Sequence, residues 1–259
     1  MVEYNKDSLF YWFPLIKGLD IPIPKTIEVP LDWDLGDICD LVDGKITAKV
    51  KRAITKVRKA VNDIGLPVFI RGDQSANKHE WSRSCFLTKS IDTQKLMAQL
   101  ADFSVMVDIG IRGYVVREFL DLDWKFHSHN GMPVASERRY FVRDGKVECW
   151  HPYWPETAIK NPDSKDWLKE LRELQTPTPK ELAILAEYAK MVGNAVKGYW
   201  SVDFCRHKNG TWYLTDMAQG DNSYHWSTCP NAPCSMLEYG KPIIEEGDTK
   251  PFKFDEEDF

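Results

Sequence analysis

Long apolar runs are missing from this sequence of 259 residues, since none approaches the roughly 20 residues that a membrane-spanning helix needs. The first residues, MVEYNKDSLFYWFPLIKG, also lack the basic segment followed by an apolar one that marks a secretory signal. We therefore expect a cytoplasmic protein with no membrane partner.

An excess of positive charge is missing as well. Asp and Glu outnumber Lys and Arg by 39 to 34, and the formal net charge is −5. General nucleic-acid binding depends on a basic surface that neutralises phosphates, so this balance disfavours a nucleic-acid partner. Hydrophobic residues make up 43% of the chain, which is enough for the core of one large domain or of two small lobes.

Closely spaced cysteines are few. The six cysteines lie mostly far apart in apolar or strand-like surroundings, which excludes a secreted disulfide framework and favours a reducing compartment. They are Cys39, Cys85, Cys149, Cys205, Cys229 and Cys234. The last two, in CPNAPC, leave open a redox pair or a zinc site, although their spacing without a second pair is more typical of loop cysteines. His127 and His129 offer two imidazoles on one strand face, with no third ligand in the nearby sequence.

Proline interrupts residues 1–33. Pro14, Pro22, Pro24 and Pro30 predict short strands or edge segments there and exclude a long helix. Over 47–64 the apolar residues recur at steps of three and four with Lys and Arg between them, which predicts an amphipathic helix.

The rest of the chain alternates short β-rich runs with helical periodicity. We expect strands over 67–71, 84–88, 114–120, 137–143 and 146–154, helices over 92–103, 164–174 and 179–196, and a final hairpin over 201–218. Asp144–Gly145 and Asn209–Gly210 supply the tight turns of two hairpins. This mixed order predicts an α+β fold.

The final hairpin carries one aspartate on each strand. Folding at its turn brings Asp203 and Asp216 together, and strand alternation allows both to lie on one face. Two facing carboxylates repel each other, so the pair is reasonable around a divalent cation. The alternative is two solvated aspartates at the strand ends, one of them paired with Arg206 or Lys208.

Two further stretches carry charges that suit a nucleotide site. In ERRYFVR, Glu137 and Arg139 point to the same side, where they either pair with each other or face a cleft that binds phosphate or carboxylate. The loop FIRGDQSANKHEWS has Arg71 at its stem and Lys78 near its tip, which suits a flexible flap over phosphates. It lacks the GxxxxGK[ST] pattern of a Walker loop, and the alternative is a plain charged connection.

Taken in order, these stretches resemble the ATP-grasp superfamily. The resemblance runs from Pro67 to Ser223: strand, flap and strand, a helix, an apolar strand ending in Arg-Glu-Phe-Leu, the run Glu-x-Arg-x-Phe-Val-x-x-Gly-x-Val, and a late Asp followed by an acidic strand. It implies an α+β fold of two lobes with mainly antiparallel sheets and with ATP and Mg²⁺ held between them. Members of the superfamily usually join a carboxylate to an amine through an acyl phosphate.

The resemblance divides the chain into four parts. We expect an N-terminal lead-in over 1–46, a small lobe with the flap over 47–113, a large lobe over 114–240 and an acidic tail over 241–259. The composition of the tail predicts that it is partly disordered.

The resemblance also implies where the nucleotide lies. Adenine is expected at the inter-lobe hinge formed by Glu118, Phe119 and Leu120, with Asp121 or Asp123 bound to the ribose hydroxyls.

Phosphate binding and catalysis fall on other matching positions. Arg71 and Lys78 are expected to bind the phosphates, Glu137 to line the nucleotide site, and Arg139 to act with Lys78 in catalysis. Each is taken from the position that matches the family's order of motifs.

Magnesium ligands are implied at Asp203 and Asp216. At the second position the superfamily usually has Glu-x-Asn, whereas this chain has Asp-Met-Ala, so the amide ligand is missing. Replacement oxygens are offered nearby by Gln219, Asp221 and Asn222.

The implied function is a Mg-ATP-dependent ligase that joins a small-molecule or peptide carboxylate to an amine or a similar nucleophile. An alternative is a non-enzymatic nucleotide-binding assembly protein, because the changed motif resembles divergent viral and phage branches and the branch with a cell-division-cycle chaperone of a translation initiation factor. The acidic tail then offers a docking peptide for a protein partner. A third interpretation is an α+β domain whose site-like residues are all surface charges.

Overall fold

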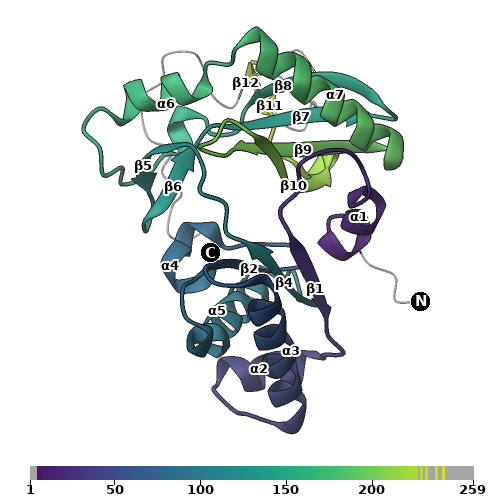
Figure 1. The fold of residues 1–259 in the computed structure, drawn as a ribbon, viewed down its shortest axis with the longest axis vertical. Coiled ribbons are helices and arrows are strands. Elements are labelled where there is room, and N and C mark those ends of the chain that lie inside the picture. The colour runs from purple at the N-terminus through teal and green to yellow at the C-terminus, as the bar shows by residue number, and fades with distance from the viewer. Residues whose placement is uncertain (1–4, 227, 230, 233–236, 239–240, 243–259) are drawn as a thin grey trace.

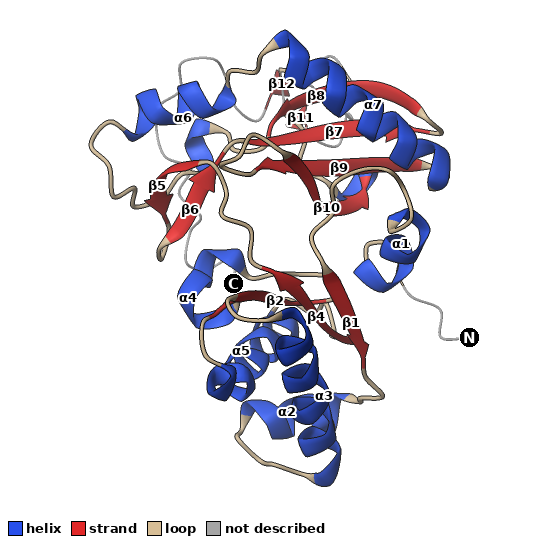
Figure 2. Ribbon diagram, viewed as in Figure 1, coloured by secondary structure: helices blue, strands red, loops and turns tan. Residues whose placement is uncertain are grey.

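The protein is described by a computed structural model over residues 5–226, 228–229, 231–232, 237–238 and 241–242. These residues form two lobes, and the chain passes from one to the other after α1 and again after β4 (Figure 1). Each lobe has a four-stranded sheet with helices packed against it (Figure 2). Neighbouring strands in both sheets are antiparallel, so the predicted α+β fold of two lobes is confirmed.

The small-lobe sheet has the strand order β1-β4-β2-β3. Its strands are β1 (Thr26–Pro30), β2 (Val68–Gly72), β3 (Phe86–Leu87) and β4 (Gly113–Glu118). The helices of this lobe are α2 (Leu35–Val42), α3 (Ala48–Ile64), α4 (Trp81–Ser84) and α5 (Thr93–Met106). Their apolar faces and the sheet form one continuous core.

The large-lobe sheet has the strand order β10-β9-β7-β8. Its strands are β7 (Glu137–Arg143), β8 (Lys146–Pro152), β9 (Tyr199–Arg206) and β10 (Trp212–Gln219). Helices α1 (Leu9–Ile16) and α7 (Pro179–Ala195) share its core. Beside it lie the hairpin β5 (Trp124–Ser128) and β6 (Met132–Ala135), covered by α6 (Trp167–Gln175), and the short pair β11 (Leu237–Glu238) and β12 (Lys241–Pro242).

The predicted amphipathic helix is confirmed by α3. The Thr47 side chain accepts a hydrogen bond from Val50 N at 3.2 Å, which satisfies a backbone donor that the first turn leaves free. Val50, Val57 and Val61 are fully buried against the sheet. Burial of each such side chain contributes about 1.5–3 kcal/mol, which holds the helix in place.

The hairpin between β7 and β8 also follows its prediction. Asp144 and Gly145 have φ values of 46° and 83°, the left-handed conformations that a two-residue turn needs. The strands and helices predicted elsewhere lie within a few residues of their expected ends, apart from the two segments described next.

Two local predictions are wrong. Leu9–Ile16 is a helix rather than an extended segment, because the Ser8 side chain caps it and its Leu9, Trp12 and Ile16 side chains are fully buried in the large-lobe core. This burial outweighs the helix-breaking effect of Pro14, which lies inside the helix. The strand expected over 84–88 shortens to Phe86–Leu87, because Trp81–Ser84 forms a helical turn.

The lobe boundaries also differ from those expected. The small lobe begins before residue 47, because β1 and α2 belong to it, and it ends after residue 113, because β4 lies between β1 and β2 in its sheet. Of the acidic tail, only Lys241–Pro242 is described. The predicted disorder of 243–259 therefore lies outside the described residues, as does Cys234.

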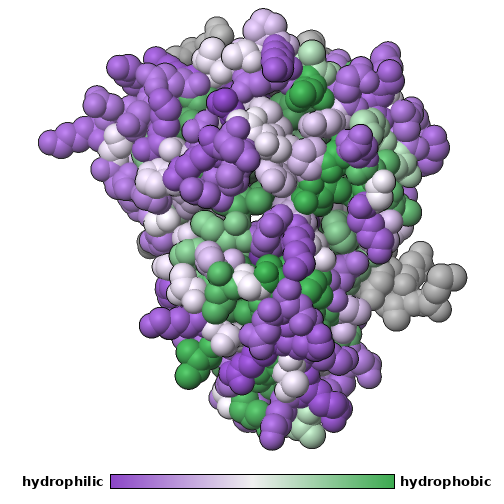
Figure 3. All heavy atoms as spheres, viewed as in Figure 1, coloured by the Kyte–Doolittle hydropathy of each residue, from purple (hydrophilic) through white to green (hydrophobic). Residues whose placement is uncertain are grey.

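The molecular surface is mixed. Figure 3 shows hydrophilic residues over most of one face, with hydrophobic residues scattered between them. Ile91 and Met106 of the small lobe are the most exposed of the large apolar side chains described, at 76% and 77%. No helix in the described part of the chain is long and apolar enough to cross a membrane.

Candidate functional site

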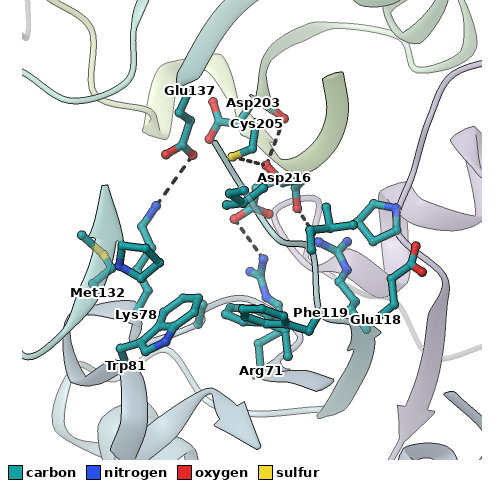
Figure 4. A pocket seen from close by; sticks show the side chains of 18 of the residues that line it. Arg71, Lys78, Trp81, Glu118, Phe119, Met132, Glu137, Asp203, Cys205 and Asp216 are labelled. Atoms are coloured by element: carbon teal, nitrogen blue, oxygen red, sulfur yellow. Dashed lines mark hydrogen bonds and ion pairs between the residues drawn. The ribbon is translucent and has the colours of Figure 1, made fainter. Parts of the chain in front are cut away.

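A cavity of about 130 Å³ lies where the two lobes face each other. It is lined from the small lobe by β2, the flap and the end of β4, and from the large lobe by β6, β7, β9 and β10. Figure 4 shows Glu137, Asp203 and Cys205 projecting into this space from the large lobe, opposite Arg71 and Trp81 of the small lobe. The polar side chains that the sequence singled out therefore meet at an interface between lobes.

The hinge forms one wall of the cavity. Glu118, Phe119 and Leu120 line it, as the resemblance implied. Asp121 and Asp123, the two candidates for the ribose, do not line it. Their carboxylates form ion pairs with basic side chains at the end of the β9–β10 hairpin, at 2.8 Å and 3.2 Å, to Lys208 and Arg206 respectively.

Asp203 and Asp216 lie directly opposite each other on β9 and β10. The register of β10 shifts at this point, and such a bulge re-aims a side chain locally. Asp203 is 3% exposed, and its two oxygens accept hydrogen bonds from Arg139 Nε at 2.7 Å and Nη2 at 2.8 Å. This two-pronged pair fixes the carboxylate in one orientation. The alternative in which Arg206 or Lys208 binds an aspartate of this pair is wrong, because those side chains reach the hinge instead.

Asp216 forms an ion pair across the lobe interface. Its Oδ2 lies 2.9 Å from Nη1 of Arg71, whose side chain is 4% exposed. Burial opposes the charge on Asp216, but the guanidinium groups of Arg71 and Arg117 outweigh it and hold the pKa of this carboxyl below its usual value. Both aspartates are therefore ionised at neutral pH and are suited to bind a cation.

Lys78 reaches from the flap to the large lobe. Its Nζ lies 3.8 Å from Glu137 Oε1, 4.0 Å from the centre of the Tyr153 ring and 4.7 Å from that of Trp154. Burial opposes its charge, but Glu137 and the Tyr153 hydroxyl outweigh this and raise the pKa of Lys78 above its ordinary value. The ammonium group therefore stays charged. The alternative in which Glu137 pairs with Arg139 is wrong, because Glu137 faces Lys78 and Arg139 binds Asp203.

Arg117 is a site residue to which the sequence gave no role. It lies in β4, is 4% exposed and lines the cavity, and its Nη1 donates a hydrogen bond to the Thr215 carbonyl. Its Nε and Nη2 are buried and have no hydrogen-bond partner among the described residues. Burial, together with the nearby Arg71, lowers the pKa of Arg117 to about 9, so it remains charged at neutral pH. The signal in the sequence was an arginine inside a Val-rich strand.

The three replacement oxygens near the changed motif do not line the cavity. Gln219 and Asn222 donate their side-chain amides to the Asp7 carboxylate, at 3.3 Å and 2.7 Å, and Gln219 N donates to it as well, at 2.5 Å. Asp221 is exposed. The cation position therefore rests on Asp203 and Asp216.

The remaining candidates lie elsewhere. His127 Nδ1 lies 2.9 Å from a carboxylate oxygen of Asp163, and the His129 ring stacks on His79 with centroids 3.9 Å apart. The two imidazoles therefore have different partners and do not form a metal pair.

The groups around the cavity fit a nucleotide with a divalent cation. Asp203 and Asp216 supply the oxygen ligands that Mg²⁺ prefers. Arg71, Lys78 and Arg117 line the cavity with positive charge that suits phosphates. The aromatic side chains Phe69, Trp81 and Phe119 line the same cavity and offer an apolar surface for a base.

Comparison with known proteins places this geometry. A family model described as an ATP-grasp domain, family 3 of its clade, matches residues 50–233, a range that includes every charged side chain of the cavity. No curated protein matches the sequence.

Solved structures share the fold at low sequence identity. The chain is similar to Cdc123 from Schizosaccharomyces pombe, with a TM-score of 0.53 and 15% identity, over 85% of this chain and 87% of that one. It is also similar to the biotin carboxylase domain of 2-oxoglutarate carboxylase from Hydrogenobacter thermophilus, solved with MgADP and bicarbonate. That likeness has a TM-score of 0.51 and 10% identity, over 82% of this chain and 39% of that one.

Proposed function

Because this chain belongs to a family of ATP-grasp domains, we propose that it binds Mg-ATP between its lobes and uses it to join a carboxylate to an amine. The observation that carries the proposal is the meeting of two ionised aspartates with Arg71, Arg139 and Lys78 at the lobe interface. Such a set of charges has a clear use when a polyphosphate and a divalent cation lie between them.

The adenine ring would lie against the hinge. Phe119 contacts a group of aromatic side chains, with centroids 4.8 Å from Phe86 and 6.3 Å from Trp81. Flat, apolar walls of this kind stack on a base, and the hinge backbone supplies hydrogen-bonding groups to its edge.

The phosphates would lie deeper, between the flap and the β9–β10 hairpin. Mg²⁺ bound to Asp203 and Asp216 would neutralise the charge that develops on the phosphoryl oxygens. Arg71 and Arg139 each hold one of these carboxylates in place and present further N–H groups on the same side. Lys78, on the flap, would bind the terminal phosphate from the other side.

Ligase chemistry then follows from these positions. The carboxylate substrate attacks the terminal phosphorus of ATP, ADP leaves, and the amine displaces phosphate from the acyl phosphate. Transition-state charge on the transferred group is stabilised by the fixed guanidinium and ammonium groups, which need no reorganisation at the moment of reaction.

Nucleotide binding requires a movement of the flap. The cavity of about 130 Å³ is smaller than the roughly 300–1,000 Å³ of ligand pockets. Lys78 closes it from the flap side through its contact with Glu137 and the Tyr153 and Trp154 rings. These contacts must separate when ATP binds, and they re-form over its phosphates.

A second function is favoured by one observation. The amides of Gln219 and Asn222 bind Asp7, so only two carboxylates serve the cation. A site with few cation ligands is suited to a protein that binds nucleotide and responds to it without turnover, such as an assembly factor.

Calorimetry of ATP binding with and without Mg²⁺ tests the proposal. Asp203→Asn and Asp216→Asn keep the shape of the site and remove one charge each, and Asp221→Asn is the matched control because that carboxylate is exposed outside the cavity. We expect Mg²⁺-dependent binding that weakens at least about tenfold in the two site variants, the equivalent of one lost charge-assisted contact.

Turnover separates the two functions. ADP release in the presence of a carboxylate and an amine would support the ligase. Binding without ADP release across a broad acceptor screen would support the second function, and absence of binding to folded wild-type protein would reject both.

A further inference from the structure

A cluster of metal-binding side chains lies in the large lobe, outside the nucleotide site. One ligand atom each from Cys149, His225 and Cys229 lies within 4.8 Å of the other two. None of these residues lines the inter-lobe cavity.

The fold brings these residues together from two segments. Cys149 lies on β8, the edge strand of the large-lobe sheet, opposite Phe141 of β7. The segment after β10 passes over this edge, and the His225 ring stacks on Phe141 with centroids 4.0 Å apart and planes 24° apart. This stacking places His225 Nε2 3.2 Å from Cys149 Sγ.

Cys229 is held by the backbone around it. Cys229 N donates to the Trp226 carbonyl at 2.9 Å, and Ala232 N donates to the Cys229 carbonyl at 3.0 Å. The side chain of Asn231 donates to the Glu148 carbonyl of β8 at 2.8 Å, which ties this turn to the strand that carries Cys149. The third ligand is therefore fixed beside the other two.

Two sulfur atoms and one imidazole nitrogen are a donor set that selects zinc. Thiolate and imidazole ligands in tetrahedral geometry are typical of Zn²⁺, whereas Mg²⁺ and Ca²⁺ take oxygen ligands. Bonds of about 2.3 Å to sulfur and about 2.0 Å to nitrogen separate tetrahedral ligands by about 3.5–3.8 Å. The observed spacing needs only small side-chain movements to reach that geometry. Burial lowers the pKa of His225, which leaves the neutral ring with a lone pair for a metal.

We propose that Cys149, His225 and Cys229 bind one zinc ion, with water in the fourth position. Binding releases one proton from each of the two thiols to solvent, and the two thiolates neutralise the charge of Zn²⁺. This site does not depend on the proposed ligase activity.

The zinc would staple the segment after β10 to the edge of the sheet. Tyr224 precedes His225, and its carbonyl accepts a hydrogen bond at 3.2 Å from Arg139 Nη1. Arg139 in turn holds Asp203 in the nucleotide site. The ion would therefore hold the backbone that positions Arg139, which links a structural metal to the geometry of the other site.

The full chain, purified without chelator, tests this proposal. We expect about one zinc per chain by elemental analysis, since the cluster forms a single site. Replacement by Co²⁺ after removal of zinc should give the thiolate-to-cobalt charge-transfer band and the visible bands of tetrahedral cobalt. This spectrum needs no variant, so it is independent of any folding defect.

Variants identify the ligands. Cys149→Ser, His225→Gln and Cys229→Ser should each lose most of the bound zinc, whereas Cys39→Ser, an exposed cysteine of α2, should keep it. Zinc should also raise the thermal unfolding midpoint of the wild type and leave that of the Cys149 variant unchanged.

Three results would overturn the proposal. They are the absence of zinc and of a cobalt spectrum in wild-type protein with free thiols, a Cys149–Cys229 disulfide found by mass spectrometry of the unreduced protein, and zinc retained by all three variants. ATP binding is measured separately, so failure here leaves the nucleotide proposal intact.

Discussion

At the scale of single residues, this protein places charge where the surrounding structure has to balance it. Arg71 is 4% exposed and depends on Asp216, while Asp203 is held by two hydrogen bonds from Arg139. A buried charge without a partner is costly, so these pairs stabilise the fold as well as the site. Replacing one member therefore changes stability and binding together.

The Arg71–Asp216 pair gives the first prediction. Asp216→Ala should lower the free energy of unfolding by about 2 kcal/mol, less than the roughly 3–5 kcal/mol of a fully buried pair, because the Asp216 side chain is 40% exposed. Urea denaturation measures the loss. Adding Arg71→Met should recover most of it, and a double variant no more stable than Asp216→Ala would contradict the argument.

Cysteine reactivity gives a second prediction at this scale. Burial raises the pKa of Cys85 to about 12 and that of Cys205 well above its ordinary value, whereas Cys39 is exposed. With iodoacetamide at mildly alkaline pH, peptide mapping should show rapid labelling of Cys39 and almost none of the two buried thiols. Rapid labelling of Cys205 would mean that the inter-lobe cavity opens readily to small reagents.

At the scale of elements, each unit of the fold has a local cause that the sequence carries. Helix α7 begins with a capping box in which Thr178 Oγ1 accepts from Glu181 N and Glu181 Oε2 accepts from Thr178 N. Its inner face packs on β7 and β8, where Gly193 lies against the Gly145 turn.

Gly193 gives a prediction whose sign is decided by packing. In an exposed helix, Gly→Ala stabilises by about 1 kcal/mol. At this position a Cβ would lie 2.4 Å from Val142 Cγ2 and 3.0 Å from the Gly145 backbone. Gly193→Ala should therefore destabilise by about 1–3 kcal/mol in chemical denaturation. Gly18→Ala, with open space around the added atom, is the matched control and should be close to neutral.

At the scale of the whole molecule, the first described residues connect the two lobes. Ser8 Oγ donates to the Asp73 carboxylate of the small lobe at 2.6 Å, and Asp7 accepts hydrogen bonds from Gln219 and Asn222 of the large lobe. The cavity lies between the surfaces that this strap joins. An N-terminal segment that the sequence indicated only as a lead-in therefore contributes to the relative placement of the lobes.

The strap gives the last prediction. Asp7→Ala removes the acceptor of three hydrogen bonds, two of them from Gln219 and one from Asn222, and should lower the free energy of unfolding by about 1–3 kcal/mol. Asp20→Ala, an exposed carboxylate of the same segment, should have almost no effect. Equal stabilities of the two variants in guanidinium titrations would show that the strap contributes nothing.

Much of the candidate site could be read from the sequence because it depends on short-range order. The turn at Asn209–Gly210 sets the register that brings Asp203 and Asp216 together, and strand alternation separates Glu137 from Arg138. Arg117 was missed because the two ends of its side chain's environment, β4 and Thr215 of β10, are far apart in the chain.

The sequence by itself determined the helices and strands, the hairpin turns and the facing aspartates, because each follows from residues a few positions apart. The tertiary structure alone decided the partners of the charges, the strap at Asp7 and the cluster around Cys149. Arg139 and Asp203 are 64 residues apart, and Asp7 and Gln219 are 212 apart. Contacts over such distances form only when the burial of apolar faces has fixed the relative positions of whole elements, and no local pattern encodes them.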